Sequence, residues 1–249
     1  MKLCNHSRLI GNTTYTVRFA QDVDDVLAAQ ALRFNVFNLE LGEGLETSWF
    51  HQRDADQFDG ACDHLLIEYT PTGKLVGTCR LQTGEMAAKQ LGYYSAQEFE
   101  FKPFEGLRAE LVELGRICID HQHRSFIVFT LLWRGIADYA RIRGARYLCG
   151  CSSLFSQDSA IGAAVYAQLK RDYLIELQWR TMPLSNFQFP LIDTPTHTLS
   201  IPKLLSAYLG IGAKICGPPA FDWAFGTIDF LTFLELAEMT SRVKNRFLA

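Results

Sequence analysis

The segment from Glu110 to Cys151 constrains the fold of this chain more than any other. Residues Glu110 to Asp120 form an apolar run that is long enough for a buried strand. A helix follows directly, because one stripe at helical spacing holds Phe126, Phe129, Leu132, Trp133, Ile136, Ala137 and Ala140. Gly144 is well placed to cap this helix, and Ala145 to Cys151 reads as the next strand. A strand, a helix and a second strand in this order predict an α/β fold.

The rest of the chain repeats the same kinds of element. Strands are predicted over Tyr15 to Ala20, His64 to Tyr69, Lys74 to Leu81 and Thr227 to Leu236, and helices over Val23 to Phe37, Asp158 to Tyr173 and Lys203 to Leu209. Residues 83 to 108 read as an irregular insertion with a short helix around Ser95 to Phe99. The length of 249 residues suits one domain over residues 1–249, with 181–249 as its less regular part.

Composition narrows the class of partner and the compartment. A net charge of -3 argues against nucleic-acid binding, which usually needs a strongly basic surface. No segment reaches the roughly 18 apolar residues of a membrane span, and the N-terminus lacks the apolar core of a secretory signal. Seven cysteines without framework spacing suit a reducing, cytoplasmic location. Cys149 and Cys151 share one face of a strand and lack a second ligand pair for zinc, so we expect them in the core.

Two charged residues stand inside the apolar run LVELGRICID, where unpaired charges are costly. They are Glu113 and Arg116, and a spacing of three sends their side chains to opposite faces of a regular strand. Gly115 lies between them and is a natural place for a β-bulge, which would re-aim one side chain. The two residues therefore either form a structural ion pair or line a site.

Further charges stand next to apolar elements. Arg80 ends the apolar run LVGTCRL, and Arg33 lies beside Phe34 and Phe37 on the first predicted helix. An acidic group precedes the strand at residue 64, and it consists of Asp54, Asp56, Asp59 and Asp63. Taken singly, the arginines could also be ordinary surface cations, and the aspartates could also be turn and helix-cap residues.

The order of these residues resembles the acyl-homoserine-lactone synthases, which belong to the Gcn5-related N-acyltransferase (GNAT) superfamily. The surrounding words are more similar still to the ornithine N-acyltransferases, over roughly residues 10 to 240. They include ALRFNVFNLELG, FDGACDHLLI, LVGTCRL, GYYSAQEF, ELGRICI, LLWRGIADYAR, CGCSSL and YLGIGAKICGPPAFDWAFGTIDF. The resemblance implies a GNAT fold of the α/β (α+β) class, a mixed central sheet with helices on both faces and a β-bulge in the central strand.

The resemblance also implies a reaction. A (3-hydroxy)fatty acyl group would pass from acyl carrier protein to the α-amine of an amino acid, with L-ornithine favoured, by direct attack on the thioester. The donor is acyl-phosphopantetheine on the carrier protein, and no tightly bound cofactor or metal is expected. Glu113 is the candidate base, since burial raises the pKa of a carboxyl group, while Arg116 would lower it. Backbone N–H groups at the Gly115 bulge would stabilise the oxyanion.

Other residues would bind the acceptor. Arg33, Arg80 and Arg116 are candidates to bind its carboxylate and to pair with Asp56 and Asp59. Either aspartate would suit the distal ammonium of ornithine by its charge. Three aromatic residues would close the acceptor pocket or belong to the core, namely Phe37, Trp49 and Phe58.

The donor side departs from members of the superfamily that use acetyl-CoA. Those carry a glycine-containing loop that approaches the pyrophosphate, whereas Asp120 to Val128 holds no glycine. We therefore expect a carrier-protein donor, with Arg124 at the start of the helix contacting its phosphate. A basic group would dock the acidic carrier protein or form a solvated face, and it comprises Arg141, Arg143, Arg146, Lys170 and Arg171.

Other functions stay open at this point. A metal enzyme would use Asp120, His121 and His123, or the acidic run from Asp54 to Asp63, but neither matches the spacing of a known motif. A carrier- or lipid-binding module without catalysis is a second alternative. A third is synthesis of another N-acyl amino acid or of a signal like acyl-homoserine lactone. A lipid product also suggests peripheral contact with the inner membrane.

Overall fold

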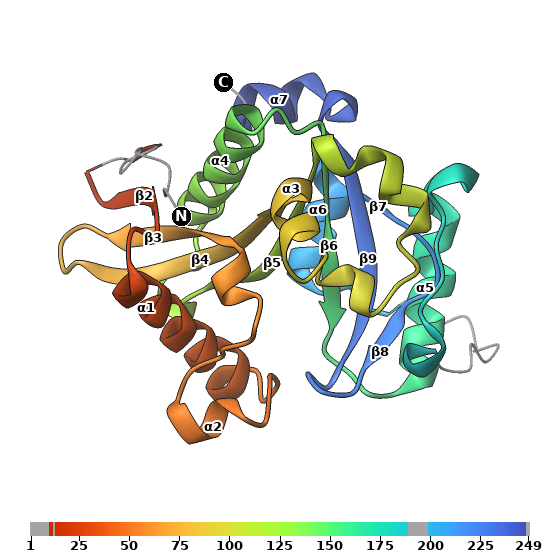
Figure 1. Ribbon diagram of the computed structural model, residues 1–249, viewed down its shortest axis with the longest axis horizontal. Coiled ribbons are helices and arrows are strands. Elements are labelled where there is room, and N and C mark those ends of the chain that lie inside the picture. The colour runs from red at the N-terminus through yellow and green to blue at the C-terminus, as the bar shows by residue number, and fades with distance from the viewer. Residues whose placement is uncertain (1–9, 12, 189–198, 248–249) are drawn as a thin grey trace.

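The computed structural model describes residues 10–11, 13–188 and 199–247. Within them the strands form one sheet in the order β1-β2-β3-β4-β5-β6-β9-β7, and β8 pairs with β9 (Figure 1). β5 and β6 are parallel, and the other pairs are antiparallel. The strands are β1 (Ile10–Gly11), β2 (Tyr15–Phe19), β3 (Asp63–Tyr69), β4 (Lys74–Thr83), β5 (Leu111–Ile119), β6 (Tyr147–Leu154), β7 (Lys214–Ile215), β8 (Ala220–Asp222) and β9 (Thr227–Glu235). The predicted mixed sheet is confirmed.

Helices cover both faces of this sheet. They are α1 (Val23–Phe34), α2 (Ser48–His51), α3 (Gly84–Lys89), α4 (Phe126–Ile142), α5 (Ser159–Tyr173), α6 (Lys203–Ile211) and α7 (Ser241–Phe247). Successive side chains of a strand point to opposite faces. In β3, Leu65 and Ile67 pack in the core that α4 covers, whereas Leu66 packs with Ala29 of α1. The α/β fold with helices on both faces is therefore confirmed.

Local capping explains where the two longest helices begin and end. The Ser125 side chain caps α4 by accepting a hydrogen bond from the Val128 N–H, and Gly144 follows the helix with a φ of 67°. Asp158 caps α5 in the same way through the Ala160 N–H. The predicted bounds of both helices therefore hold to within about two residues.

Several short elements, namely β1, α2, β7, β8 and α7, were not predicted, and three further elements also differ from prediction. β6 continues past Cys151 to Leu154 because its last residues pair with Ile228 to Leu231 of β9, a contact that its own sequence does not reveal. The helix predicted to reach Phe37 changes at residue 35 into a π-helical segment over Asn35–Glu40. α3 lies in the insertion that was predicted to be irregular, and the Thr83 side chain caps it.

The sheet divides at its centre, where β5 and β6 diverge. Their pairing ends at Glu113 and Cys149, after which β5 follows β4 and β6 follows β9. Gly150 stands at the point of divergence, where a Cβ atom would lie 2.2 Å from the carbonyl oxygen of Leu114. The close approach of the two backbones before they separate therefore requires glycine there.

The predicted β-bulge lies in β5 and opens the same region. Thr78 and Arg80 of β4 pair with Cys118 and Gly115, so β5 holds one extra residue between them. The left-handed residue is Arg116, with a φ of 49°, and not the glycine before it. A non-glycine residue in this conformation is uncommon, and such positions often mark functional sites.

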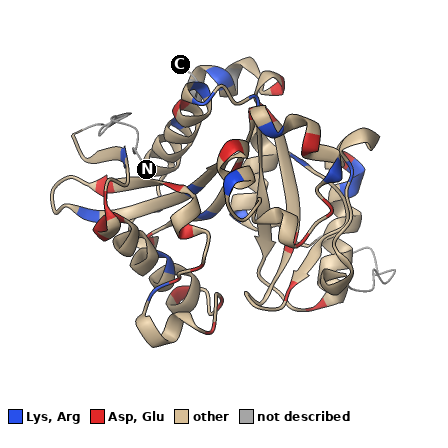
Figure 2. Ribbon diagram, in the orientation of Figure 1, with Lys and Arg blue, Asp and Glu red and all other residues tan. Residues whose placement is uncertain are grey.

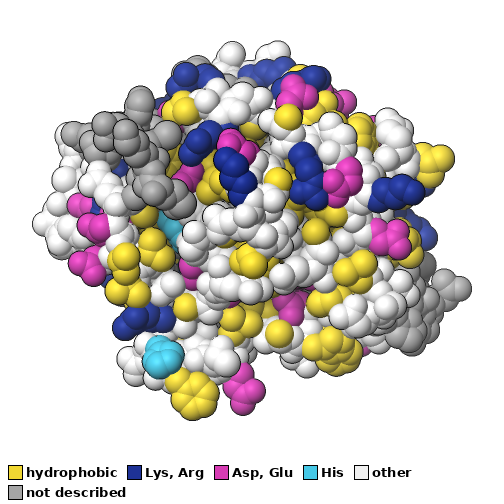
Figure 3. Space-filling view, in the orientation of Figure 1, with side chains coloured by type: hydrophobic (Ala, Val, Ile, Leu, Met, Phe, Trp, Pro, Cys, Tyr) yellow, Lys and Arg dark blue, Asp and Glu magenta, His cyan; other side chains and the backbone are white. Residues whose placement is uncertain are grey.

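The distribution of charged residues agrees with the small net charge of the chain. Lys, Arg, Asp and Glu are interspersed along the ribbon (Figure 2), and on the face in Figure 3 charged side chains stand mostly singly or in pairs. No helix within the described residues is long and apolar enough to span a membrane. The less regular region predicted over 181–249 includes residues 189–198 and 248–249, which lie outside the described part. That residues 1–249 form one domain stays a prediction.

Candidate active site

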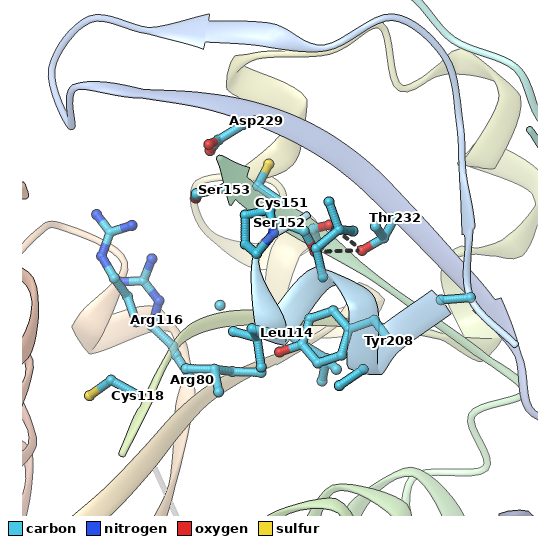
Figure 4. A pocket seen from close by; sticks show the side chains of 18 of the residues that line it. Arg80, Leu114, Arg116, Cys118, Cys151, Ser152, Ser153, Tyr208, Asp229 and Thr232 are labelled. Carbon is cyan, nitrogen blue, oxygen red and sulfur yellow. Dashed lines mark hydrogen bonds between the residues drawn. The ribbon is translucent and has the colours of Figure 1, made fainter. Parts of the chain in front are cut away.

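A cavity of about 950 Å³ lies where β5 and β6 diverge. Its walls come from β5, β6, β9, α6 and the start of α4 (Figure 4). Much of the lining is apolar and includes Leu114, Trp133, Leu148, Tyr208 and Leu234. At one place it is bordered by Phe126 and Phe155, whose side chains are more than half exposed. The cavity therefore combines an apolar interior with access to solvent, as a ligand tunnel requires.

Glu113 lines this cavity and is 4% exposed. Its carboxylate accepts hydrogen bonds of 2.7 Å from the backbone N–H groups of Tyr94 and Ser95. Burial raises the pKa of Glu113, although these hydrogen bonds and the charge of Arg80 oppose the rise. Arg116 ion-pairs elsewhere, so the alternative of a structural Glu113–Arg116 pair is wrong.

Three arginines and three aspartates form an arginine–aspartate network beside the cavity. Its ion pairs are Arg33–Asp54 and Arg33–Asp59 at 2.8 Å, Arg80–Asp56 at 2.6 Å, and Arg80–Asp59, Arg116–Asp54 and Arg116–Asp56 at 3.2 Å. Burial alone would raise the pKa of Asp59, but Arg33 holds it well below its usual range. The network is balanced, because each side supplies three charges.

The residues predicted from the sequence divide into two groups by position. Six of them line the cavity: Phe37, Arg80, Glu113, Gly115, Arg116 and Arg124. Arg33, Asp56 and Asp59 stand behind it in the network, and Arg33 is fully buried. The predicted pairing of the arginines with Asp56 and Asp59 is confirmed, and Asp54 is a partner that we had not assigned.

The aromatic residues near the network also divide. Phe58 lines the cavity, and the Arg80 guanidinium lies 5.6 Å from the centre of its ring. Phe37 lines it as well and packs edge-on against Phe225 at 5.4 Å. Trp49 is 55% exposed, packs on Phe34 and is not among the residues that line the cavity, so it lies in neither of its two expected places, the acceptor pocket and the core.

Arg124 stands at the exposed end of the cavity, just before α4. Its guanidinium pairs with both carboxylate oxygens of Glu40, at 2.5 and 2.8 Å, and donates to the Ile119 carbonyl oxygen at 3.0 Å. Lys203 of α6 borders the same end and is exposed. The charge of Arg124 is therefore balanced by Glu40, and no ion pair is found for Lys203 among the described residues.

A second set of charges was not predicted. Four carboxylates lie close enough for their charges to affect one another, and they form what we call the carboxylate cluster: Glu43, Glu98, Asp222 and Asp229. Burial raises the pKa of Asp229 to about 6, and the charge of Asp222 adds to this. Burial likewise raises the pKa of Glu43 to about 8. The criterion that identified Glu113, a charge inside an apolar run, also applies to Asp229 in TIDFLTFLE and would have found it.

The possibility of a metal centre can be tested against this geometry. Among the described residues, one group has ligand atoms within 4.8 Å of one another: Glu98, Cys151 and Asp229. Burial raises the pKa of the Cys151 thiol well above its usual value, and a protonated thiol is a poor metal ligand. The sequence also offered Asp120 as a metal ligand, but in the structure its carboxylate pairs with Lys74 at 2.7 Å.

Comparison with known sequences places this geometry in context. The family model for the acetyltransferase (GNAT) domain matches residues 32–134. The L-ornithine N(alpha)-acyltransferase of Brucella abortus is 35% identical over 241 residues, which cover 91% of this chain and 86% of that protein. The enzyme of the same name from Agrobacterium fabrum is 30% identical over 247 residues, with coverage of 92% and 83%.

Solved structures share the fold. FeeM, an N-acyl amino acid synthase from uncultured soil microbes, superposes with a TM-score of 0.55 at 13% identity and covers 94% of this chain and 96% of its own. The acyl-homoserine-lactone synthase LasI gives a TM-score of 0.54 at 12% identity, with 95% of each chain covered. At such identities the likeness concerns the fold alone.

Proposed function

Because the chain belongs to the L-ornithine N(alpha)-acyltransferase family of GNAT acyltransferases, we propose that it acylates the α-amine of L-ornithine. The donor is a (3-hydroxy)fatty acyl group on acyl carrier protein, and the product is lyso-ornithine lipid. One observation carries the proposal: a buried carboxylate, Glu113, faces a largely apolar cavity at the point where β5 and β6 diverge. The cavity accepts the acyl chain, and the carboxylate accepts a proton.

Glu113 serves as the base in this mechanism. The free α-amine titrates near 8, so a carboxylate close to it, directly or through one water, removes the proton as the amine attacks. A C–N bond forms, the C–S bond breaks, and the thiol of phosphopantetheine leaves with a proton. The Tyr94 N–H donates to this carboxylate, and both the N–H and the hydroxyl of Ser95 donate to it as well, which leaves one of its four lone-pair positions for the amine.

The bulge in β5 supplies stabilisation for the oxyanion. The extra residue between Gly115 and Cys118 takes part of the strand out of register with β4, so its N–H groups differ in direction from those of a regular ladder. We assign the thioester oxygen to backbone N–H groups in this stretch, as predicted. Such preorganised donors usually contribute the largest electrostatic effect in acyl transfer.

Arg80 and Arg116 bind the carboxylate of the acceptor. Both line the cavity, while their ion pairs with Asp56 hold the two guanidinium groups in place. The Arg116 guanidinium also lies 4.6 Å from the Phe225 ring centre. Arg33 is fully buried, and we assign it the role of positioning Asp54 and Asp59.

The carrier protein docks at the exposed end of the cavity. Arg124, Ser125 and Lys203 border it, and they suit the single phosphate of phosphopantetheine. Of the basic group predicted as an alternative contact, Arg141 is about 22 Å along α4 from its first residue, so it is far from this end. Arg141 and Arg143 are also paired, with Asp138 and Asp63.

The same end carries exposed apolar side chains, which support contact with a lipid surface. Phe126, Ile127 and Phe155 are each more than half exposed, and the first and last of them border the cavity. We propose that the enzyme acts in the cytoplasm with peripheral contact at the inner membrane. No tightly bound cofactor or metal is part of this proposal.

The proposal is tested by incubating the protein with 3-hydroxyacyl carrier protein and a panel of amino acids and identifying products by mass spectrometry. We expect thiol release that depends on ornithine and saturates with it. Glu113→Gln should abolish most of this release, while the matched change Glu110→Gln, next to β5 at a partly exposed residue, should not. Homoserine lactone formation, or thiol release without any amine acceptor, would overturn the proposal.

A further inference from the structure

The carboxylate cluster differs from ordinary buried acids because its charge is not balanced. No Lys, Arg or His of the described residues ion-pairs with Glu43, Glu98, Asp222 or Asp229. The charge of Arg116 reaches Glu98 and Asp229 through space. Its guanidinium, however, is ion-paired with aspartates of the network. Buried carboxylates without a cationic partner are costly, and protons offset part of this cost, because burial raises the pKa of Glu43 to about 8 and raises that of Glu98 as well. A bound cation can take the place of these protons, so the cluster has capacity for one.

Hydrogen bonds satisfy these carboxylates to different degrees. Asp222 is well supplied, since it accepts from the N–H groups of Ala224 and Phe225 at 2.9 Å and from the Tyr94 hydroxyl at 3.3 Å. Asp229 accepts from the Thr227 hydroxyl at 2.9 Å and from the Ser153 side chain. The remaining two carboxylates are less well supplied.

Glu98 is the most buried member, and one of its oxygens has no partner among the described residues. Its side chain is 2% exposed and accepts a weak contact of 3.5 Å from the Cys151 thiol on Oε2. Within the described part of the chain, its Oε1 atom has no hydrogen-bond partner, and neither has Oε2 of Glu43. The Glu98 carboxylate is directed into the cluster, because one of its oxygens lies within 4.8 Å of ligand atoms of Cys151 and Asp229. A donor group is therefore missing there.

The cluster borders the same cavity as Glu113. Glu43, Asp222 and Asp229 line the cavity, and Figure 4 shows Asp229, Ser153 and Cys151 together on one side of it, with Arg80 and Arg116 on another. Tyr94 connects the two sites, since its N–H donates to Glu113 and its hydroxyl donates to Asp222. One tyrosine therefore spans the distance from the base to the cluster, which suits a ligand with two amines a few bonds apart.

We propose that the carboxylate cluster binds the side-chain ammonium of a diamino acid acceptor. This inference rests on the proposed function and adds the site that selects the second amine. An ammonium supplies three donors, enough for Glu98 Oε1 and an oxygen of Asp229 and of Glu43. Held there, the distal amine stays protonated and cannot attack, while the α-amine lies toward Glu113 and reacts.

The aspartates predicted for this role do not suit it. Asp56 and Asp59 already pair with Arg33, Arg80 and Arg116, and Asp59 is 7% exposed. These guanidinium groups already occupy the two carboxylates, so little attraction remains there for an ammonium. The cluster has the opposite property, because a cation reduces its excess negative charge.

The test compares ornithine with norvaline, which has the same carbon chain without the distal amine. The kcat/KM for each is measured with acyl carrier protein as donor, in the wild type, Asp229→Asn, Glu98→Gln and the surface control Asp138→Asn. Binding of ornithine without donor is measured by calorimetry in the same four proteins. We expect both cluster variants to lower the ornithine-to-norvaline ratio and ornithine affinity by about tenfold or more, and the control to change neither.

The outcomes separate this inference from the proposed function. If ornithine is acylated but both cluster variants leave the ratio and the affinity unchanged, the subsite is overturned and the function stands. If ornithine is not acylated yet binds with an affinity that depends on Asp229 and Glu98, the function fails and the subsite stands. Absence of both acylation and binding overturns both. A stoichiometric metal in the wild type that Asp229→Asn loses would also overturn the ammonium site.

Discussion

The arginine–aspartate network and the carboxylate cluster border one cavity but differ in how their charges are balanced. In the network, Arg33 is fully buried and every aspartate contacts at least one arginine at 3.2 Å or less. In the cluster, burial raises the pKa of Asp229 to about 6, and Glu98 keeps an oxygen without a partner among the described residues. Balanced buried charges hold a structure together, whereas unbalanced ones are suited to bind a ligand of opposite charge.

The largest effect should come from breaking the network. Asp59→Asn leaves Arg33 and Arg80 with less negative charge in a buried site, so we expect the free energy of unfolding to fall by about 3–5 kcal/mol. Urea unfolding measures this, with Asp138→Asn as a surface control that should change it by about 0.5 kcal/mol or less. A loss below about 1 kcal/mol for Asp59→Asn would show that the network does not stabilise the fold.

The pH dependence of stability should follow from the same residue. The pKa of Asp59 is lowered by Arg33 despite its burial, so its contribution is present above the ordinary pKa near 3.8. That contribution is lost as the pH falls through the lower folded-state value. As the pH falls from 5 to 3, the difference in the free energy of unfolding between the wild type and Asp59→Asn should therefore begin to narrow. Urea unfolding at each pH measures this.

Glu113 lies between the two groups and belongs to neither. We expect Glu113→Gln to lower kcat by about 10²–10³-fold, because glutamine keeps the shape and one acceptor oxygen but cannot take the proton. Steady-state assays at saturating ornithine measure this, corrected for the folded fraction by circular dichroism. A kcat within about threefold of the wild type would exclude Glu113 as the base.

Removing a charge from the carboxylate cluster should raise the free energy of unfolding, whereas removing one from the network should lower it. Asp229→Asn should raise the free energy of unfolding at pH 7 by about 1–3 kcal/mol, since the pKa of Asp229 is raised from 3.8 to about 6. A raised pKa gives stability that is fully present below about 4 and lost as the pH rises through about 6. The advantage of the variant should therefore grow between pH 4 and 6 and stay constant above. A variant less stable than the wild type at pH 7 would contradict the difference between the two groups.

The smallest effect concerns the pH dependence of acceptor use. As the pH falls below about 6, Asp229 takes up a proton, so kcat/KM for ornithine should fall by up to about tenfold more than that for norvaline. Asp222, Glu98, Glu43 and Arg116 face the same site and shape the curve. If the pH profiles of kcat/KM for ornithine and norvaline ran parallel, Asp229 would have no role in binding the ammonium.

The fold was largely predictable from the sequence because its main elements carry strong local signals. The stripe of α4, its Ser125 cap and Gly144 suffice to place that helix. α3 escaped prediction since six residues are too short to show a helical period. The true end of β6 at Leu154 depends on pairing with β9, which follows in the chain some 70 residues later.

The site was predictable only where a charge interrupts an apolar strand. This criterion found Glu113, Arg80 and Arg116, all of which line the cavity. It could not separate Asp56 and Asp59, which face the network, from residues that face the cavity, because the loop that carries them has no periodicity. The bulge was predicted at Gly115 because glycine adopts unusual backbone conformations most readily. In the structure, the left-handed residue is Arg116.

The position of the acyl group on ornithine is the most direct test of how the two groups of charges work together. The product formed from 3-hydroxyacyl carrier protein and ornithine is fragmented by tandem mass spectrometry to assign the acylated nitrogen. Acylation of the α-nitrogen alone is expected, since the carboxylate cluster retains the distal ammonium and Glu113 deprotonates the α-amine. Acylation of the side-chain nitrogen would contradict both roles.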